Sequence, residues 1–297
     1  MLSKGSKVGI VACSNGYLIS HEGKLKRLLD TLDQMGFVPI LSNCIFTSEG
    51  VFNGTPSQKA RELMSMFVNE EIEAIFDISG GNLANEVLEY LDYEMIRKHM
   101  KPMFGYSDVT CILNAIYSKT GGQMYLYQVR NLMYGDEILQ QDNFLQTFIF
   151  GKDHLLTYPV EWVQGNHMEG IVCGGNIRCL LKLAGTEYFP DLENKILVLE
   201  SNSGTPEAIV SMLQQLKMMG VFQKVSGILF GTFTEMEQEQ YHPDVVQLLL
   251  RVIGESTIPI AKTSWIGHGI DSKAVPIGSK LVVDNYVQVE NGKSCIR

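Results

Sequence analysis

The stretch FGYSDVTCIL, residues 104–113, joins a short apolar run to a segment with the apolar spacing of a helix. This strand-to-helix junction is typical of parallel α/β folds, and it places Ser107 at the turn. A serine there can cap the helix, because its hydroxyl accepts a hydrogen bond from an unpaired N–H group of the first turn. It can also be a nucleophile held on a tight turn against a helix N-terminus. The stretch alone leaves both interpretations open.

Upstream of this junction, strands and helices alternate. The patterns predict a strand at 7–12, a helix at 24–35, a strand at 37–41, a helix at 57–71 and a strand at 72–78, with both of the first two strands buried. Gly80 and Gly81 then form a turn that leads into another helix. This order predicts a parallel sheet with helices on both faces. Ligands bind beyond the carboxyl ends of such strands, so the glycine turn and Ser107 are expected to share one rim.

The second half is predicted to form a separate domain. Residues 135–169 are polar and irregular, and we interpret them as a crossing with the domain boundary near residue 155. The two predicted domains are therefore residues 1–155 and 156–297. Further patterns predict a strand, a Gly-Gly turn, a helix and a strand within 170–200, a helix at 206–219, a strand at 225–233, and β structure with an Asn-Gly turn in 280–297.

Composition and charge restrict the class of protein. A net charge of −9 argues against a nucleic-acid or anionic-membrane partner. No apolar stretch approaches the roughly 18 residues of a membrane span or forms a signal-peptide core, so a cytoplasmic location is expected. The cysteines and histidines show no metal-ligand spacing, and the predicted state of the thiols is reduced. The cysteines are Cys13, Cys44, Cys111, Cys173, Cys179 and Cys295.

Two residues of the second half are candidates to activate Ser107. A serine nucleophile needs a base, and the base needs a group that orients it and stabilises its charge. Glu200 closes the apolar strand KILVLE (195–200), where it can also pair with a cation or cap a loop. His268 lies between glycines in WIGHGID (265–271), where it can also be an ordinary packed or surface histidine. Each signal alone leaves these alternatives open.

Together, three segments resemble one family. Residues 79–110, 173–200 and 266–283 are similar to the LD-carboxypeptidases, serine peptidases that also include the microcin C self-immunity hydrolases. The last segment contains Gly-His and then Pro276-Ile277-Gly278, as the family does. The opening KVGIVACS, residues 7–14, also fits the family's first strand. The resemblance therefore spans nearly the whole chain in the same order.

The resemblance implies the roles of five residues. Ser107 is the nucleophile, His268 the general base and Glu200 the orienting carboxylate. The backbone N–H groups of Gly81 and Asp108 stabilise the oxyanion. The implied fold is a flavodoxin-like parallel α/β domain that carries the serine, followed by a β-rich α+β domain that carries Glu200 and His268.

The implied function is removal of a terminal D-amino acid from an L-centre in murein tetrapeptides, in cell-wall recycling, by a cytoplasmic homodimer without metal or cofactor. Two departures concern the substrate. Asn82 and Leu83 stand where typical members have tyrosine and glycine, and residues 124–135 replace a Gly-Pro turn. The alternative is a microcin C immunity-type hydrolase that cuts peptidyl-nucleotide bonds. A third, from another class, is a binding protein that has lost catalysis.

Several residues are candidates to contact a small peptide or muropeptide. Arg130 can bind a terminal carboxylate in bidentate geometry, with Arg178 as the alternative, although either can be an ion-paired surface residue. Trp265 can cover the substrate or belong to the core. Asn176 can hold its loop or the substrate backbone. The predicted substrate-binding residues are Gly80, Asn82, Arg130, Asn176 and Trp265.

Overall fold

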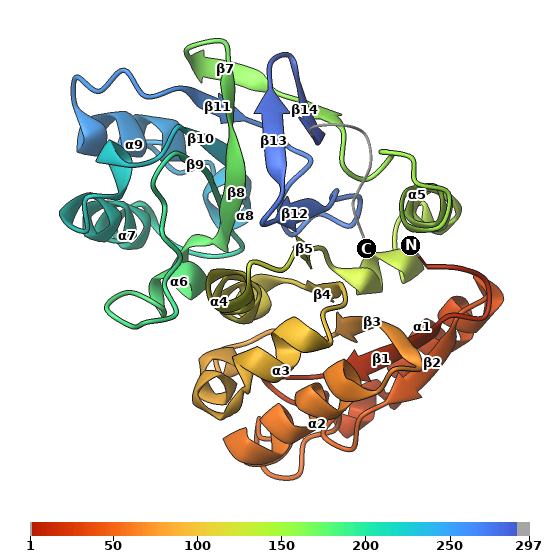
Figure 1. Cartoon of the computed structure of the whole chain (residues 1–297). Coiled ribbons are helices and arrows are strands. Elements are labelled where there is room, and N and C mark those ends of the chain that lie inside the picture. Colours follow the sequence, from red (N-terminus) through yellow and green to blue (C-terminus); the bar gives the residue numbers. More distant parts are fainter. Residues whose placement is uncertain (1, 290–297) are drawn as a thin grey trace.

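A computed structural model describes residues 2–289 and contains two sheets (Figure 1). The first sheet has the strand order β12 (Val275–Ile277), β5 (Met124–Leu126), β4 (Met103–Gly105), β3 (Ile72–Asp77), β1 (Lys7–Val11) and β2 (Val38–Leu41). Strands β1 to β5 pair in parallel and β12 is antiparallel to β5. The order 2-1-3-4-5 is the flavodoxin-like one, so the predicted fold class is confirmed.

Helices cover both faces of this sheet. One face packs on α1 (Glu22–Gln34) and α5 (Glu137–Phe148), and the other packs on α2 (Pro56–Val68), α3 (Tyr93–Lys98) and α4 (Thr110–Thr120). Side chains alternate along a strand, so Val8 and Ile10 contact the α1 side while Val11 contacts the α2 side. The predicted helices at 24–35 and 57–71 are confirmed to within three residues at each end.

The second sheet has the order β6 (Tyr158–Pro159), β14 (Tyr286–Val289), β13 (Lys280–Val283), β8 (Met168–Asn176), β9 (Lys195–Ser201), β10 (Gly227–Phe233), β11 (Ile260–Lys262) and β7 (Glu161–Gln164). Its centre, β8 to β11, is parallel, and its outer strands pair antiparallel. The remaining α-helices are α6 (Ile177–Leu181), α7 (Pro206–Met218), α8 (Thr234–Gln238) and α9 (Val245–Ile253).

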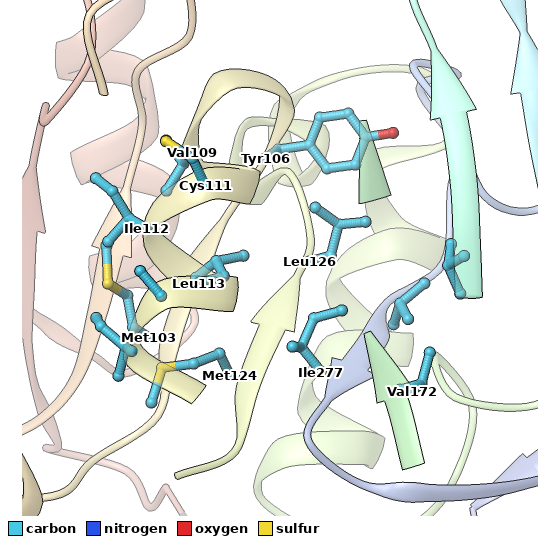
Figure 2. Packing of buried hydrophobic residues seen from close by; sticks show 14 of the residues in the cluster. Met103, Tyr106, Val109, Cys111, Ile112, Leu113, Met124, Leu126, Val172 and Ile277 are labelled. Carbon is cyan, nitrogen blue, oxygen red and sulfur yellow. The ribbon is translucent and has the colours of Figure 1, made fainter. Parts of the chain in front are cut away.

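Helix α4 lies between the two sheets and joins their cores. Figure 2 shows Leu113 on the side of this helix that faces Leu126 of β5, Ile277 of β12 and Val172 of β8, while Ile112 points to the opposite side, and all belong to one buried cluster. All of these side chains are fully buried. The turn that carries Ser107 leads directly into α4, so the packing of this helix fixes the turn between the carboxyl ends of strands from both sheets.

One prediction for the middle of the chain is wrong. Residues 135–169 are not irregular, because they contain α5, β6 and β7. Asp136 caps α5 by accepting a hydrogen bond from the Leu139 N–H at 3.0 Å. Phe144 and Phe148 are buried, but Ile138 is 82% exposed on the same helix. This exposed residue and the run of Gln, Asp and Asn obscured the apolar spacing.

Smaller differences follow from local packing. Strand β2 is only partly buried, because it lies at a sheet edge with a single neighbour. Gly174 and Gly175 lie inside β8, so the predicted Gly-Gly turn is wrong. A Cβ at Gly174 would lie 2.2 Å from the Val198 carbonyl oxygen. The helix after Gly81 is a 3₁₀ helix, η2 (Ala84–Tyr90). The other 3₁₀ helices are η1 (Ile19–His21), η3 (Ser107–Val109), η4 (Val129–Met133) and η5 (Val221–Gln223).

The predicted β structure near the C-terminus is confirmed by the β13–β14 pair. The Asn-Gly turn at residues 291–292 and Cys295 lie outside the described residues. Within residues 2–289, the helices are all too short or too polar to cross a bilayer.

Candidate active site

Ser107 lies in a strained turn after β4. Its φ of 52° is in the left-handed region, which non-glycine residues rarely adopt and which costs of order 1–3 kcal/mol. Gly105 makes the turn possible, because a Cβ there would lie 2.4 Å from Cγ1 of Val109. Neither η3 nor α4 is capped by a side chain, since their N-cap positions are Tyr106 and Val109. The helix-cap interpretation of Ser107 is therefore wrong.

The glycine turn after β3 lies beside Ser107. A Cβ built on Gly80 would be 3.9 Å from Cβ of Ser107. Asp77 anchors this turn, because its buried carboxylate accepts hydrogen bonds from the backbone N–H groups of Ser79 at 2.8 Å and Cys13 at 3.0 Å. Burial raises the pKa of Asp77, and these hydrogen bonds oppose that effect. The glycine turn and Ser107 therefore share one rim, as predicted.

Gly81 requires the absence of a side chain. Its φ is +133°, and a Cβ would lie 2.2 Å from Cγ of Asn15. Within residues 2–289, neither the backbone N–H of Gly81 nor that of Asp108 donates a hydrogen bond. Two free N–H groups beside a serine hydroxyl form the kind of donor pair that stabilises an oxyanion.

Glu200 and His268 form a buried hydrogen-bonded pair. Glu200 lies near the carboxyl end of β9 with a fully buried side chain, and its Oε2 is 2.8 Å from Nδ1 of His268. The His268 side chain is 17% exposed. Oε1 of Glu200 and Nε2 of His268 are buried and have no hydrogen-bond partner among the described residues. The carboxylate thus fixes one ring nitrogen and leaves the other available to exchange a proton.

Tyr106 connects this pair to the serine turn. Its ring packs edge-on against the His268 ring with 4.8 Å between centroids. Burial and then the Glu200 carboxylate raise the pKa of Tyr106, so its phenol stays protonated. The phenol oxygen itself makes no hydrogen bond within normal distance to any described residue. No hydrogen bond joins Ser107 to His268 Nε2 here, and such catalytic bonds often tighten only when substrate binds.

The loop that carries His268 is held by residues that the sequence analysis missed. Asn131 of η4 donates from Nδ2 to the Gly269 carbonyl oxygen at 3.1 Å and to Oγ of Ser272 at 3.1 Å. The Thr232 N–H donates to the Ile266 carbonyl oxygen at 2.8 Å. These partners are far apart in sequence, so no local pattern could have identified Asn131.

A polar cavity of about 390 Å³ opens beside Ser107. Arg178 is the only charged residue among the described residues that line it. Its Nη1 donates to Oδ1 of Asn82 at 2.6 Å and its Nη2 donates to the Gly81 carbonyl oxygen at 3.0 Å. The lining residues are Gly81, Asn82, Ser107, Asn176, Arg178, Ser201, Asn202 and Ser203.

The other predicted substrate contacts lie in different places. Asn176 lines the cavity, and its Oδ1 accepts from the Cys179 N–H at 3.3 Å to cap α6. Arg130 is half-buried, donates to Oε1 of Gln128 at 3.1 Å and does not line the cavity. Trp265 lines a separate cavity of about 470 Å³ in the second half of the chain, where Lys273 lies 5.4 Å from its ring centroid.

Within residues 2–289, no group of three His, Cys, Asp or Glu side chains could hold a metal ion. The arrangement at Ser107 is suited to nucleophilic attack. It combines a cavity-lining serine on a strained turn, a histidine oriented by a carboxylate, and two free backbone donors.

The matches to known families agree with this arrangement. Residues 8–128 match the model of the LD-carboxypeptidase N-terminal domain, and residues 169–283 match that of the C-terminal domain. These segments cover most of the chain, so the protein belongs to the LD-carboxypeptidase family.

Individual relatives extend over nearly the full length. A probable murein peptide carboxypeptidase of Bacillus subtilis is 30% identical over 292 residues, which cover 95% of this chain and 90% of the relative. The structure of MccF in complex with glutamyl sulfamoyl guanosine superposes with a TM-score of 0.88 at 22% identity, covering 99% of this chain and 98% of that one. Muramoyltetrapeptide carboxypeptidase from Oxalobacter formigenes gives a TM-score of 0.77 at 22% identity, with 95% and 97% covered.

Proposed function

We propose that this protein is a serine carboxypeptidase that removes a terminal D-amino acid from an L-centre in murein tetrapeptides. One observation carries the proposal: the buried Glu200–His268 pair lies next to the strained turn of Ser107, in a chain of the LD-carboxypeptidase family. The Bacillus subtilis relative named a probable murein peptide carboxypeptidase supports this substrate class.

The reaction follows the chemistry of a serine triad. Oγ of Ser107 attacks the scissile carbonyl carbon while Nε2 of His268 takes its proton. Glu200 stabilises the imidazolium that forms. The N–H groups of Gly81 and Asp108 donate to the oxyanion, and His268 then protonates the leaving amine of the D-amino acid. Water, deprotonated by His268, hydrolyses the acyl-enzyme and regenerates Ser107.

Arg178 is the residue that we propose for the terminal carboxylate. A guanidinium has five N–H donors, and Arg178 uses two of its nitrogens to hold Asn82 and Gly81. Its remaining donors and its charge lie at the cavity that Ser107 lines. Arg130 lacks this position, so we assign it no contact with the carboxylate. Asn82 and Asn176 supply further polar contacts to the peptide at the same cavity.

The experiment that tests the function compares substrates. The purified protein is incubated in parallel with a murein tetrapeptide that ends in L-diaminopimelate-D-Ala, with its L-Ala-terminated counterpart, and with a peptidyl-adenylate mimic. Mass spectrometry follows the products. We expect release of D-alanine and little cleavage of the other two. Cleavage of the mimic alone would transfer the assignment to the immunity-type hydrolases. If the folded protein cleaves none of the three compounds, the result would indicate a binding protein.

Family membership supports three further proposals. We propose that the protein acts in the cytoplasm, that it forms a homodimer, and that its nucleophile domain ends near residue 155. Light scattering after size-exclusion chromatography tests the second, and we expect twice the 33.2 kDa mass of the chain. A mass equal to that of one chain at micromolar concentration would contradict the homodimer.

A further inference from the structure

Asp108 directly follows the candidate nucleophile, its side chain is fully buried, and both oxygens of its carboxylate have partners. Its Oδ2 accepts hydrogen bonds from Oγ of Ser14 at 2.7 Å and from the Ala84 N–H at 2.8 Å. Its Oδ1 forms an ion pair with Nζ of Lys182. A carboxylate held in this way fixes its own backbone, because moving it would break three contacts.

Lys182 makes a second contact that reaches the glycine turn. Its Nζ donates to the Asn82 carbonyl oxygen at 2.7 Å. Asn82 directly follows Gly81, whose N–H is the other candidate oxyanion donor. One ammonium group therefore bridges the two segments that carry the two donors. Its side chain is 16% exposed, and Lys182 does not line the cavity beside Ser107.

We propose that the Asp108–Lys182 ion pair positions the oxyanion donors, by holding the Gly81 N–H in a fixed relation to the Asp108 N–H. This inference rests on the proposed serine mechanism and extends it to two side chains that do not touch the substrate. An oxyanion hole acts only when its donors lie about 2.7–3.1 Å from the developing charge. A displacement of about 1 Å can cost on the order of 100-fold in rate.

The pair also joins the two halves of the chain. Lys182 follows α6 in the second half, whereas Gly81 and Asp108 follow β3 and β4 of the first sheet. Arg178, on α6 itself, contacts the same turn, but it lies at the cavity and can contact substrate. Lys182 is therefore the residue whose removal separates donor positioning from substrate binding.

The test measures the reactivity of Ser107 with a fluorophosphonate, a probe that needs no murein recognition. Oγ of Ser107 displaces fluoride from phosphorus, its proton passes to His268, and the phosphoryl oxygen occupies the oxyanion site. Intact-mass spectrometry gives the labelling rate. We expect Lys182→Met to label about 10–100-fold more slowly than the wild type, and its kcat on the tetrapeptide to fall similarly with KM changed less than about threefold.

A matched lysine provides the control. Nζ of Lys101 donates to the carbonyl oxygens of Met66, Asn69 and Ile72, away from Ser107. Lys101→Met also removes a partly buried ammonium, and we expect it to label at the wild-type rate. This comparison separates donor positioning from a general loss of stability.

A second variant keeps the test decisive if Lys182→Met does not fold. Asp108→Asn preserves the backbone N–H and the side-chain shape but removes the charge, and we expect the same slow labelling. Where both variants fold, we expect the double variant to be labelled no more slowly than the slower single variant, because both substitutions break the same ion pair.

Wild-type labelling rates in folded Lys182→Met or Asp108→Asn would overturn the inference. So would a double variant whose loss is the product of the two single losses. A wild type that reacts with the probe but leaves the tetrapeptide intact would refute the proposed substrate. The variant labelling rates would still decide the role of the pair.

Discussion

Oε2 of Glu200 lies 2.8 Å from Nδ1 of His268, although the two residues are 68 positions apart, Glu200 in β9 and His268 in the loop between β11 and β12. The carboxylate is fully buried, and its Oε1 has no hydrogen-bond partner among the described residues, so the contact with His268 is the one hydrogen bond that it makes there. A buried carboxylate that orients one nitrogen of a histidine stabilises the protonated ring. This contact orients His268, the proposed base for Ser107.

Glu200→Gln therefore tests the orienting role. The amide keeps the size of the side chain but cannot stabilise an imidazolium, so we expect kcat to fall on the order of 10³–10⁴-fold. Thermal unfolding checks that the variant is folded. Glu237→Gln removes an exposed carboxylate that accepts from the Phe233 N–H, and it is expected to keep wild-type kcat. Equal kcat values for wild type and Glu200→Gln would contradict the triad.

Arg178→Gln tests recognition of the terminal carboxylate. We compare kcat/KM for the tetrapeptide with kcat/KM for its D-alaninamide analogue, which lacks the carboxylate. For the variant, kcat/KM on the acid should fall about 10–100-fold, which corresponds to the loss of one charge-assisted hydrogen bond. On the amide, kcat/KM should fall much less. Arg130→Gln is the control and should leave kcat/KM unchanged on both substrates. Equal losses on both substrates would assign Arg178 only to holding the glycine turn.

Gly81→Ala tests the oxyanion turn. The new Cβ overlaps the Asn15 side chain and φ is +133°, so the N–H must shift and kcat is expected to fall about 10²–10³-fold. Gly121 offers a matched control, because its φ is +74° and a Cβ there would have no atom within 4 Å. Gly121→Ala should lose only about 1 kcal/mol of stability and keep its kcat. An active Gly81→Ala would exclude that N–H as a donor.

Stability is predicted to fall steeply above pH 10. Burial raises the pKa values of Tyr106, Tyr125, Tyr127 and Tyr158, so the folded state keeps their protons after the unfolded state has released them. The contribution of these tyrosines to stability is therefore fully present below about pH 10 and is lost as pH rises, at about 1.4 kcal/mol per pH unit for each tyrosine. Urea unfolding at pH 9 and pH 11 measures the change in the free energy of unfolding. Tyr106→Phe should make the dependence of this free energy on pH less steep by the contribution of one proton. An unchanged slope would show that Tyr106 ionises normally in the folded state.

The parallel arrangement of the first sheet could be predicted, because its apolar runs alternate with helices of clear spacing, whereas the flavodoxin-like type was implied only by the family resemblance. The helix α5 could not, because its exposed Ile138 and its polar neighbours hide the buried face formed by Phe144 and Phe148. Strand β12 was also unpredictable. Its three residues join the first sheet from the far end of the chain, and only tertiary packing determines that pairing.

At the site, Ser107, Glu200 and His268 could be singled out because each stands at an element end or between glycines. Their positioning residues could not. Lys182 and Asn131 act through backbone carbonyl groups of distant segments, and such partners leave no local pattern in the sequence. The sequence analysis preferred Arg130 to Arg178 for the terminal carboxylate, and the cavity beside Ser107, which Arg178 lines and Arg130 does not, favours the opposite choice.

The most direct test of the account is D-alanine release from a murein tetrapeptide by wild type and Ser107→Ala. Ser107→Ala removes one oxygen from a cavity-facing side chain, so the fold and the substrate affinity should be retained. Mass spectrometry measures the released D-alanine, and Ser48→Ala, away from this cavity, is the control. The account predicts release by the wild type and the control, and none above background by Ser107→Ala. Release by Ser107→Ala at a rate near that of the wild type would contradict it.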